Sequence, residues 1–167
     1  DMAINVGSNC YFTSDICNLS RLPDQPYTAG GWGYIGGIAH STTSEIYNTL
    51  DGPIYQTWRE GNWSYKIDAP IGEYEIELLI ADVTKPAAQL ANLLNKNKEE
   101  KHSGETRFHI SICGKQVETN FSPIDGGKHR TAFKRRYIIR NEHDHIVISA
   151  GAVKGEPFLA GIKVRKL

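Results

Sequence analysis

The sequence predicts an all-β protein, a β-sandwich of the jelly-roll type. Apolar and polar residues alternate through most of the chain after residue 53, which is the period of a β-strand. Segments rich in Gly and Pro separate these stretches, as they do between short strands. Eight or nine such strands with little helix favour a jelly roll over a closed barrel. The length of 167 residues fits a single domain, 1–167.

The clearest strand is expected in GEYEIELLIADV (72–83), where four apolar side chains alternate with three glutamates. This predicts a half-buried antiparallel strand with an acidic solvent face. RFHISICG (107–114) repeats the alternation, and Gly114-Lys115 begins a tight connection into QVETNF (116–121). The side chains expected in the core are Tyr74, Ile76, Leu78, Ile80, Phe108, Ile110 and Ile112. Further strands are expected in MAINV (2–6), WSYKID (63–68), TAFKRRYIIR (131–140), HIVISA (145–150) and FLAGIKVRKL (158–167).

One short helix is expected in PAAQLANLL (86–94), where leucines follow at spacings of three and four. The polar run NKNKEEKHSGE (95–105) has nothing to bury and is predicted to be a solvated loop. Together they form an insertion over residues 85–105. The first 52 residues, apart from the opening strand, are expected to be a long irregular segment over one edge of the sandwich.

The charge balance excludes two classes of partner. The chain has 19 Lys+Arg and 19 Asp+Glu, whereas nucleic acids and anionic membrane surfaces are bound by an excess of cations. No run approaches the ~20 apolar residues that cross a bilayer, and the first residues do not read as a signal peptide. We expect a soluble domain of a longer protein, with no nucleic acid and no membrane as partner.

The three cysteines leave the question of a disulfide open. Cys10 and Cys17 are close enough in sequence to form a bridge, which would leave Cys113 unpaired. Cys113 itself is expected to be a small, half-buried strand residue.

No metal or other cofactor is expected. His143 and His145 share one strand face at a spacing that suits a metal, but no third ligand completes the set. A structural calcium site built from loop oxygens is a weaker alternative, without the spacing of an EF-hand. Its candidate ligands are Asp15, Asp24, Asp51 and Glu156.

Catalytic motifs do not emerge from the sequence. Residues 31–36 match G-x-G-x-x-G, but neither a preceding strand nor a following helix is predicted, so we reject a nucleotide site. No G-x-S-x-G elbow is present. Three carboxylates in loop-like settings, Glu60, Asp82 and Glu156, are the candidates for a glycosidase, and nothing marks two of them as a pair.

Aromatic side chains among polar loop residues point instead to sugar binding. Pyranose C–H faces stack on aromatic rings, and hydroxyls pair with charged and amide groups. Trp32 and Tyr34 are the strongest candidates, because their glycine-rich segment is expected to be a loop with both rings exposed. Trp58 and Trp63 are as well explained by the core.

Six segments that cover most of the chain, with residues 85–105 as an insertion, share a combination of motifs. They are AINVGS (3–8), D-x-P-Y (24–27), GGWGYIGG (30–37), PIYQTWREGNWSYKIDAPIGEYEIELLIADV (53–83), FHISICGKQV (108–117) and GEPFLAGIKV (155–164). This combination resembles the malectin and malectin-like domains, carbohydrate-binding modules of the family 57 type. GGWGYIGG in this place is similar to the modules appended to bacterial glycoside hydrolases. The resemblance implies a galactose-binding-like jelly roll of two antiparallel sheets, non-catalytic, that recognises carbohydrate through loops at one end.

The family's sugar contacts transfer only in part. One aromatic position falls on Trp32, a second falls on Glu60, an aromatic pair falls on Thr84 and Lys85, and an acidic position falls near Glu156. Three aromatic contacts are therefore missing. A rebuilt site would use Trp32, Tyr34, Arg59, Glu60, Lys85 and Glu156. The cations Arg59 and Lys85 would suit an acidic or sulfated glycan.

Three functions follow from this resemblance and from the residues. The first is a non-catalytic carbohydrate-binding module that targets an attached glycoside hydrolase to a polysaccharide or oligosaccharide. The second is a structural accessory domain that packs on its parent enzyme without binding sugar. An autonomous glycoside hydrolase has the least support. The implied partners are a carbohydrate and a catalytic domain of the same polypeptide, in a secreted, periplasmic or cell-surface bacterial protein.

Overall fold

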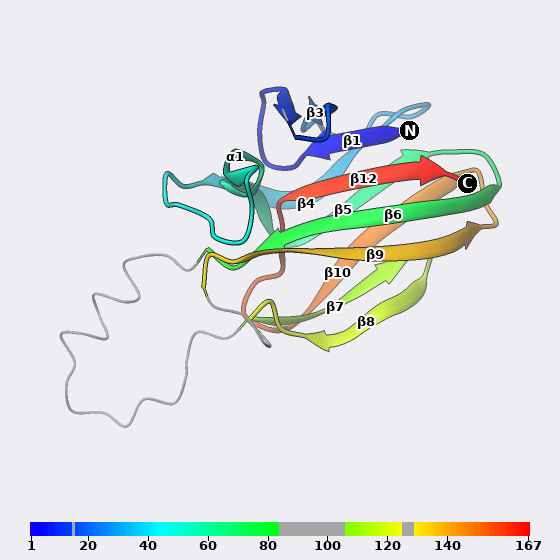
Figure 1. The fold of residues 1–167 in the computed structure, drawn as a ribbon. Coiled ribbons are helices and arrows are strands. Elements are labelled where there is room, and N and C mark those ends of the chain that lie inside the picture. Colours follow the sequence, from blue (N-terminus) through cyan, green and yellow to red (C-terminus); the bar gives the residue numbers. More distant parts are fainter. Residues whose placement is uncertain (15, 84–105, 125–128) are drawn as a thin grey trace.

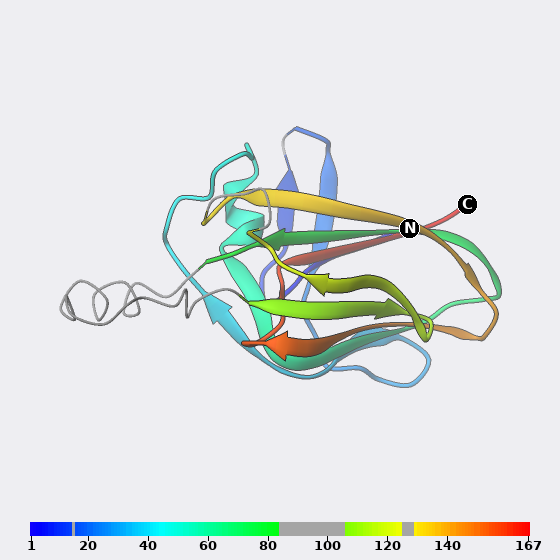
Figure 2. The same cartoon turned by 90° about the horizontal axis from the view of Figure 1, so that it is seen from below.

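The chain folds into two layers of β-strands, which confirms the predicted β-sandwich (Figure 1). The computed structural model describes residues 1–14, 16–83, 106–124 and 129–167. The helix expected at 86–94 and the loop after it lie outside the described residues. Figures 1 and 2 show that the long strands of both layers follow the long axis of the molecule. The two termini lie at the same end because the first and last strands are antiparallel neighbours.

The first sheet has six strands. In spatial order they are β2 (Phe12–Ser14), β3 (Leu19–Pro23), β1 (Met2–Asn5), β12 (Gly161–Lys166), β6 (Gly72–Ala81) and β9 (Ala132–Asn141). All neighbours are antiparallel except β1 and β3, which are parallel. The strand β9 therefore forms one edge of this sheet.

The second sheet is built around β5 (Thr57–Asp68). One side of β5 pairs along its length with β4 (Trp32–Ser41). Its other side pairs with β11 (Phe158–Leu159) and with β10 (His145–Lys154). From β10 the sheet continues through β7 (Arg107–Ile112) to β8 (Lys115–Phe121) at the far edge. The short helix α1 (Gly52–Tyr55) precedes β5. The sequence did not predict this helix, because one turn is too short to show a period.

The predicted core is confirmed. Tyr74 is 4% exposed, and Ile76, Leu78 and Ile80 on the same face of β6 are fully buried. The alternating side chains Phe108, Ile110 and Ile112 of β7 are at most 1% exposed. The predicted hairpin is present as well: Cys113 and Gly114 have φ of 51° and 75°, and Ile112 lies opposite Lys115. Two successive positive φ values are typical of the type I′ turns that join antiparallel strands.

The acidic face of β6 is only partly solvent-exposed. Glu73 is exposed and Glu75 is half-buried, as the alternation suggested, but Glu77 is only 7% exposed. Its Oε2 accepts a hydrogen bond of 2.8 Å from Arg136 Nη2 on β9. A buried carboxylate is tolerated when cations compensate its charge, and sequence alternation alone carries no information on such pairing.

The expectation of an irregular N-terminal segment is wrong, because β2, β3 and β4 lie within the first 52 residues. GGWGYIGG is largely strand: Trp32 pairs with Ile67, and Tyr34 pairs with Tyr65. Glycine is unfavourable in strands, so the pattern suggested a loop. Here the neighbours require it, since a Cβ at Gly33 would collide with the backbone of Pro26 and Tyr27.

Two smaller expectations also change. FLAGIKVRKL is not one strand, because Ala160 separates β11 in the second sheet from β12 in the first. Cys10 and Cys17 are both exposed and unbridged, whereas Cys113 is half-buried, as expected.

Candidate functional site

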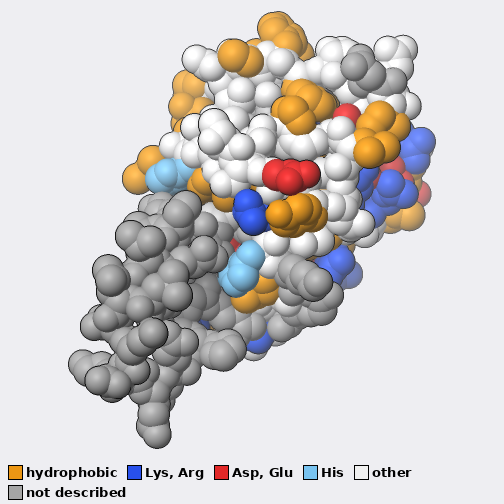
Figure 3. Space-filling view, turned by 60° about the vertical axis from the view of Figure 1, so that its left-hand side comes forward, with side chains coloured by type: hydrophobic (Ala, Val, Ile, Leu, Met, Phe, Trp, Pro, Cys, Tyr) orange, Lys and Arg blue, Asp and Glu red, His pale blue; other side chains and the backbone are white. Residues whose placement is uncertain are grey.

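Loops gather at the end of the sandwich where β6 ends and β5, β9 and β12 begin. We call this the end face, and its described residues are 42–56, 82–83, 122–124, 129–131 and 154–157. The register defines it: Ala81 lies opposite Ala132, and Ser41 lies opposite Thr57. Figure 3 turns this end toward the reader and shows small separate groups of hydrophobic side chains among polar surface.

An exposed aromatic ring on the end face is fixed by its backbone. Tyr47 is 46% exposed, and it exchanges backbone hydrogen bonds with Arg130 and Ala132, of 2.7 and 2.9 Å. The Arg130 Cζ lies 5.2 Å from the centre of the Tyr47 ring, and Arg130 Nη2 is 3.4 Å from the phenol oxygen. The guanidinium therefore holds the ring from one side by a cation–π contact.

A buried carboxylate lies beside this pair. Asp82 directly follows β6 and is 5% exposed, and its backbone oxygen accepts a 2.6 Å hydrogen bond from Arg130 N. Asp82 Oδ2 lies 3.6 Å from Nδ1 of His129, whose side chain is 48% exposed. An aromatic face, an imidazole, a guanidinium and a carboxylate thus occupy one part of the end face.

A second group near the end face surrounds Glu60. Trp58 Nε1 donates a 3.0 Å hydrogen bond to Glu60 Oε2, and His40 stacks on the Trp58 ring at 5.6 Å. Glu156 is exposed and near this group, since a Cβ at Gly61 would lie 3.5 Å from its Oε2. Of the site residues that the sequence suggested, Glu156 thus lies beside Gly61, the residue that follows Glu60. Trp58, an alternative sugar contact, is buried at 7% exposure.

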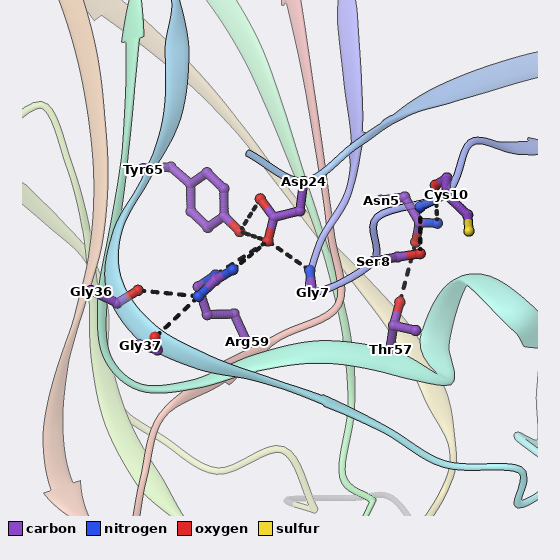
Figure 4. Close-up of polar contacts among 10 residues, drawn as sticks. All are labelled: Asn5, Gly7, Ser8, Cys10, Asp24, Gly36, Gly37, Thr57, Arg59 and Tyr65. Atoms are coloured by element: carbon purple, nitrogen blue, oxygen red, sulfur yellow. Dashed lines mark hydrogen bonds and ion pairs between the residues drawn. The ribbon is translucent and has the colours of Figure 1, made fainter. Parts of the chain in front are cut away.

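Arg59, another suggested contact, points inward to a carboxylate (Figure 4). Its Nη2 and Nε lie 2.9 and 3.2 Å from Asp24 Oδ2, and its Nη1 donates to the carbonyl oxygen of Gly37 at 3.1 Å. Burial lowers the pKa of Arg59, but the hydrogen bond and charge of Asp24 outweigh it, so the pKa is raised. Arg59 as a whole is 5% exposed, and its charge is balanced inside the protein.

Tyr34 and Trp32 do not belong to the group around Glu60. The Tyr34 ring is half-buried, and the Arg59 Cζ lies 3.4 Å from its centre, so Tyr34 packs on the internal ion pair. Trp32 is opposite Ile67, seven residues along β5 from Glu60. At ~3.3 Å per residue that separation is about 23 Å, which puts Trp32 near the opposite end of the sandwich. Thr84 and Lys85 lie outside the described residues.

Sequence reasoning did not find Tyr47, His129 or Arg130. Tyr47 lies in the segment that was expected to be irregular, and no motif marks it. Their proximity depends on the contact between residue 47 and the start of β9, which no local pattern reveals. Asp82 was considered only as a glycosidase carboxylate, and its position after the strong strand pattern of β6 was the available signal.

The expected metal positions form no complete site in the described residues. Within residues 1–14, 16–83, 106–124 and 129–167, no three His, Cys, Asp or Glu are grouped to hold a metal. Asp24 is bound to Arg59, and Asp51 Oδ2 accepts a 2.8 Å bond from Ser14. The His143 and His145 rings stack at 6.0 Å, and hydrogen bonding to His145 lowers the pKa of Asp144.

The helices of the described residues include none long and apolar enough to cross a bilayer.

An antiparallel sandwich whose end loops present an aromatic ring with charged and imidazole groups defines a class, the β-sandwich binding module. A family model narrows this class: the Malectin domain model matches residues 1–162, so the chain belongs to the Malectin domain family. This family is of the carbohydrate-binding type, and the resemblance seen in the sequence is confirmed.

Solved structures agree with the family. A β-glucuronidase of Bacteroides uniformis superposes with a TM-score of 0.85 and 42% identity, over 99% of this chain and 18% of that chain. The ANXUR2 extracellular domain of Arabidopsis thaliana has a TM-score of 0.70 over 99% of this chain and 48% of its own, and its 14% identity shows the fold alone.

A curated relative, the kinesin-like protein KIN-14E of Oryza sativa subsp. japonica, is 28% identical over 134 residues. That match covers 78% of this chain and 12% of the relative. The chain thus spans a small part of both this relative and the glucuronidase.

Proposed function

We propose that this chain is a non-catalytic carbohydrate-binding module that holds sugar on its end face. The observation that carries the proposal is the Tyr47 ring, 46% exposed and held by Arg130 beside the buried Asp82. A fixed aromatic ring loses little conformational entropy when a pyranose stacks on it. His129, whose side chain is 48% exposed, supplies a polar partner for sugar hydroxyls.

The expected residues Glu60 and Glu156 extend this proposal toward β5. Both carry carboxylates that accept hydrogen bonds from hydroxyl groups. Arg59 and Tyr34 serve the site indirectly: their stacking holds β4 against β5, and the ion pair of Arg59 with Asp24 joins β5 to the segment after β3. Trp32 has no place in this proposal, because it lies near the other end of the strand pair.

The proposed setting is a larger glycoside hydrolase, secreted, periplasmic or on the cell surface. Its support is the 42% identity to a β-glucuronidase of which this chain corresponds to 18%. A module tethered to a hydrolase raises the effective concentration of the catalytic domain at its polysaccharide. Catalysis would then belong to another domain of the same polypeptide.

A structural accessory domain is the second candidate. The observation that favours it is on β4, where Ile35 and Ile38 are 51% and 68% exposed. Apolar side chains on an outer strand suit packing against a neighbouring domain. In this alternative the end face binds no sugar.

Affinity electrophoresis of the 167-residue chain separates the two candidates. Native gels containing one polysaccharide each should retard the wild type, and Tyr47→Ala should abolish most of the retardation. Two matched controls remove aromatic rings elsewhere: Tyr11→Ala, at a side chain 71% exposed before β2, and Trp32→Ala. Both controls should be retarded like the wild type.

Three results would count against the proposal. Absence of retardation in every gel would leave the structural accessory domain. A loss in Trp32→Ala but not in Tyr47→Ala would move the site to the opposite end. Release of reducing sugar by the chain alone would identify it as a hydrolase.

A further inference from the structure

A row of cations follows the outer side of β9, at the edge of the first sheet. We call Lys134, Arg136, Ile138 and Arg140 the β9 stripe. All four are exposed, and Ile138 is 71% exposed. They occupy alternate positions, so they project from one face and extend over about 20 Å at ~3.4 Å per residue.

The neighbouring strands place glutamates and further cations beside the stripe. On β6, Glu77 lies opposite Arg136, and Glu73 lies opposite Arg140. On β12, Lys163 and Arg165 flank the other side of the glutamates. Five Lys and Arg side chains of these three strands therefore share the face with three glutamates.

Ion pairs neutralise two of the glutamates. Glu77 accepts from Arg136 at 2.8 Å, and Glu75 Oε1 lies 3.3 Å from Arg165 Nη2. Lys134 and Arg140 form no ion pair within the part of the chain that the structure describes. The net field along the edge is therefore positive, although the chain as a whole has a formal charge of zero.

The shape of the surface selects the kind of anion. A sheet edge is not concave, so it does not enclose a small ligand as a pocket does. Charges spaced along one line match an extended chain with repeated anionic groups. Ile138 sits between Arg136 and Arg140, where it offers apolar contact to the C–H groups of a sugar ring.

We propose that the β9 stripe binds a linear anionic polysaccharide, with carboxylate or sulfate groups paired to its cations. Arg130 of the end face lies two residues before β9, so a chain held at Tyr47 can continue along this strand. The inference deepens the proposed function by naming the ligand class, and it rests on that function for the role of the end face. Lysines on edge strands also prevent edge-to-edge aggregation, which is the competing explanation.

The test uses affinity electrophoresis in gels containing polygalacturonate, heparin or dextran, at low ionic strength. The variant Lys134→Gln/Arg140→Gln removes the two cations without ion pairs and leaves Arg136 with Glu77. Its dissociation constant for the anionic polymers should rise about fivefold, and the difference should shrink in salt. Its binding to dextran should equal that of the wild type. Polygalacturonate and heparin distinguish carboxylate from sulfate.

The matched control is Lys66→Gln/Lys115→Gln, which removes the same charge from β5 and β8 of the other sheet, away from the end face. It should bind the anionic polymers like the wild type, after correction for mobility in gels without polymer. An equal loss in both double variants would show attraction to net charge alone and would overturn the proposal. So would a wild type that neither anionic polymer retards.

Three further outcomes are informative. Binding to vesicles of phosphatidylserine and phosphatidylcholine without retardation by either polysaccharide would assign the stripe to a membrane and overturn the proposal. If Tyr47→Ala changes nothing while Lys134→Gln/Arg140→Gln weakens polyanion binding, the stripe stands and the proposed end-face site fails. If Tyr47→Ala weakens polyanion binding while Lys134→Gln/Arg140→Gln changes nothing, the proposed role of the stripe fails and the end-face site stands.

Discussion

Arg59 and Asp24 form a buried ion pair that joins the two sheets. Asp24 follows β3 of the first sheet, and Arg59 belongs to β5 of the second, with 2.9 Å between Nη2 and Oδ2. Their side chains are 6% and 3% exposed. The Asp24 carboxylate also accepts hydrogen bonds from Tyr65 and from the backbone of Gly7. Both charges are therefore compensated at the place where the layers meet (Figure 4).

Asp24→Asn should strongly destabilise the fold. The guanidinium of Arg59 would remain buried without a counter-charge, which typically costs about 3–5 kcal/mol. Urea denaturation followed by circular dichroism measures the change in the free energy of unfolding. The control Asp144→Asn alters an exposed carboxylate paired with His145 and should cost much less. Equal losses in the two variants would refute the structural role of the pair.

Gly7→Ala should destabilise more than Gly114→Ala, although both glycines have nearly the same backbone angle. Their φ values are 76° and 75°, so the strain of a positive φ, about 1–2 kcal/mol, is common to both. A Cβ at Gly7 would collide with the backbone of Trp58, whereas Gly114 has nothing within 4 Å. Thermal unfolding should give the lower Tm for Gly7→Ala. A Tm of Gly7→Ala at or above that of Gly114→Ala would mean that the N-terminal segment moves away.

The sequence predicted the strands and core residues that can be recognised from the alternation of apolar and polar residues. Phe108 and Tyr74 were assigned to the core because the strand period is two, and burial of one face enforces that period. The alternation of apolar and polar residues did not reveal β4. Gly33 lies so close to the backbone of Pro26 that a side chain would collide with it, and such a glycine suggests a loop when only the sequence is seen. The residues that would contact a sugar were harder to predict. Arg59 was assigned to a sugar because it lies next to Glu60, which falls on a contact position of the family that the sequence resembles, while its partner Asp24 is 35 residues away.

Arg136→Gln should lower the free energy of unfolding, and Arg140→Gln should leave it almost unchanged. Both arginines lie on the outer side of β9, but only Arg136 donates to Glu77, which is 7% exposed. Without that donor, the nearest cation to Glu77 is Arg21, with 3.9 Å between Nη2 and Oε1. A buried carboxylate that loses a hydrogen bond destabilises the folded state, and the exposure of Arg136 moderates the effect. Urea denaturation of the two variants side by side measures the difference; equal stabilities would show that water replaces the donor.

The fold should lose stability in alkali, starting near pH 10. Burial is the main cause that raises the pKa of Tyr55, Tyr65 and Tyr137 above the usual value for tyrosine. In the unfolded chain these phenols ionise near pH 10, so above that pH the unfolded state binds fewer protons than the folded state. The stabilising contribution of the neutral phenols is therefore complete below pH 10 and declines as the pH rises.

Absorbance at 295 nm, recorded with circular dichroism between pH 8 and 12, tests this pH dependence. The ionisation of these three among the eight tyrosines should accompany loss of the β-sheet signal. Tyr137→Phe provides the comparison: it removes one titrating phenol, together with its hydrogen bond to Glu118. It should lower the slope of unfolding free energy against pH by about one proton. If all eight phenols ionise near pH 10 while the sheet signal is intact, burial does not control their titration.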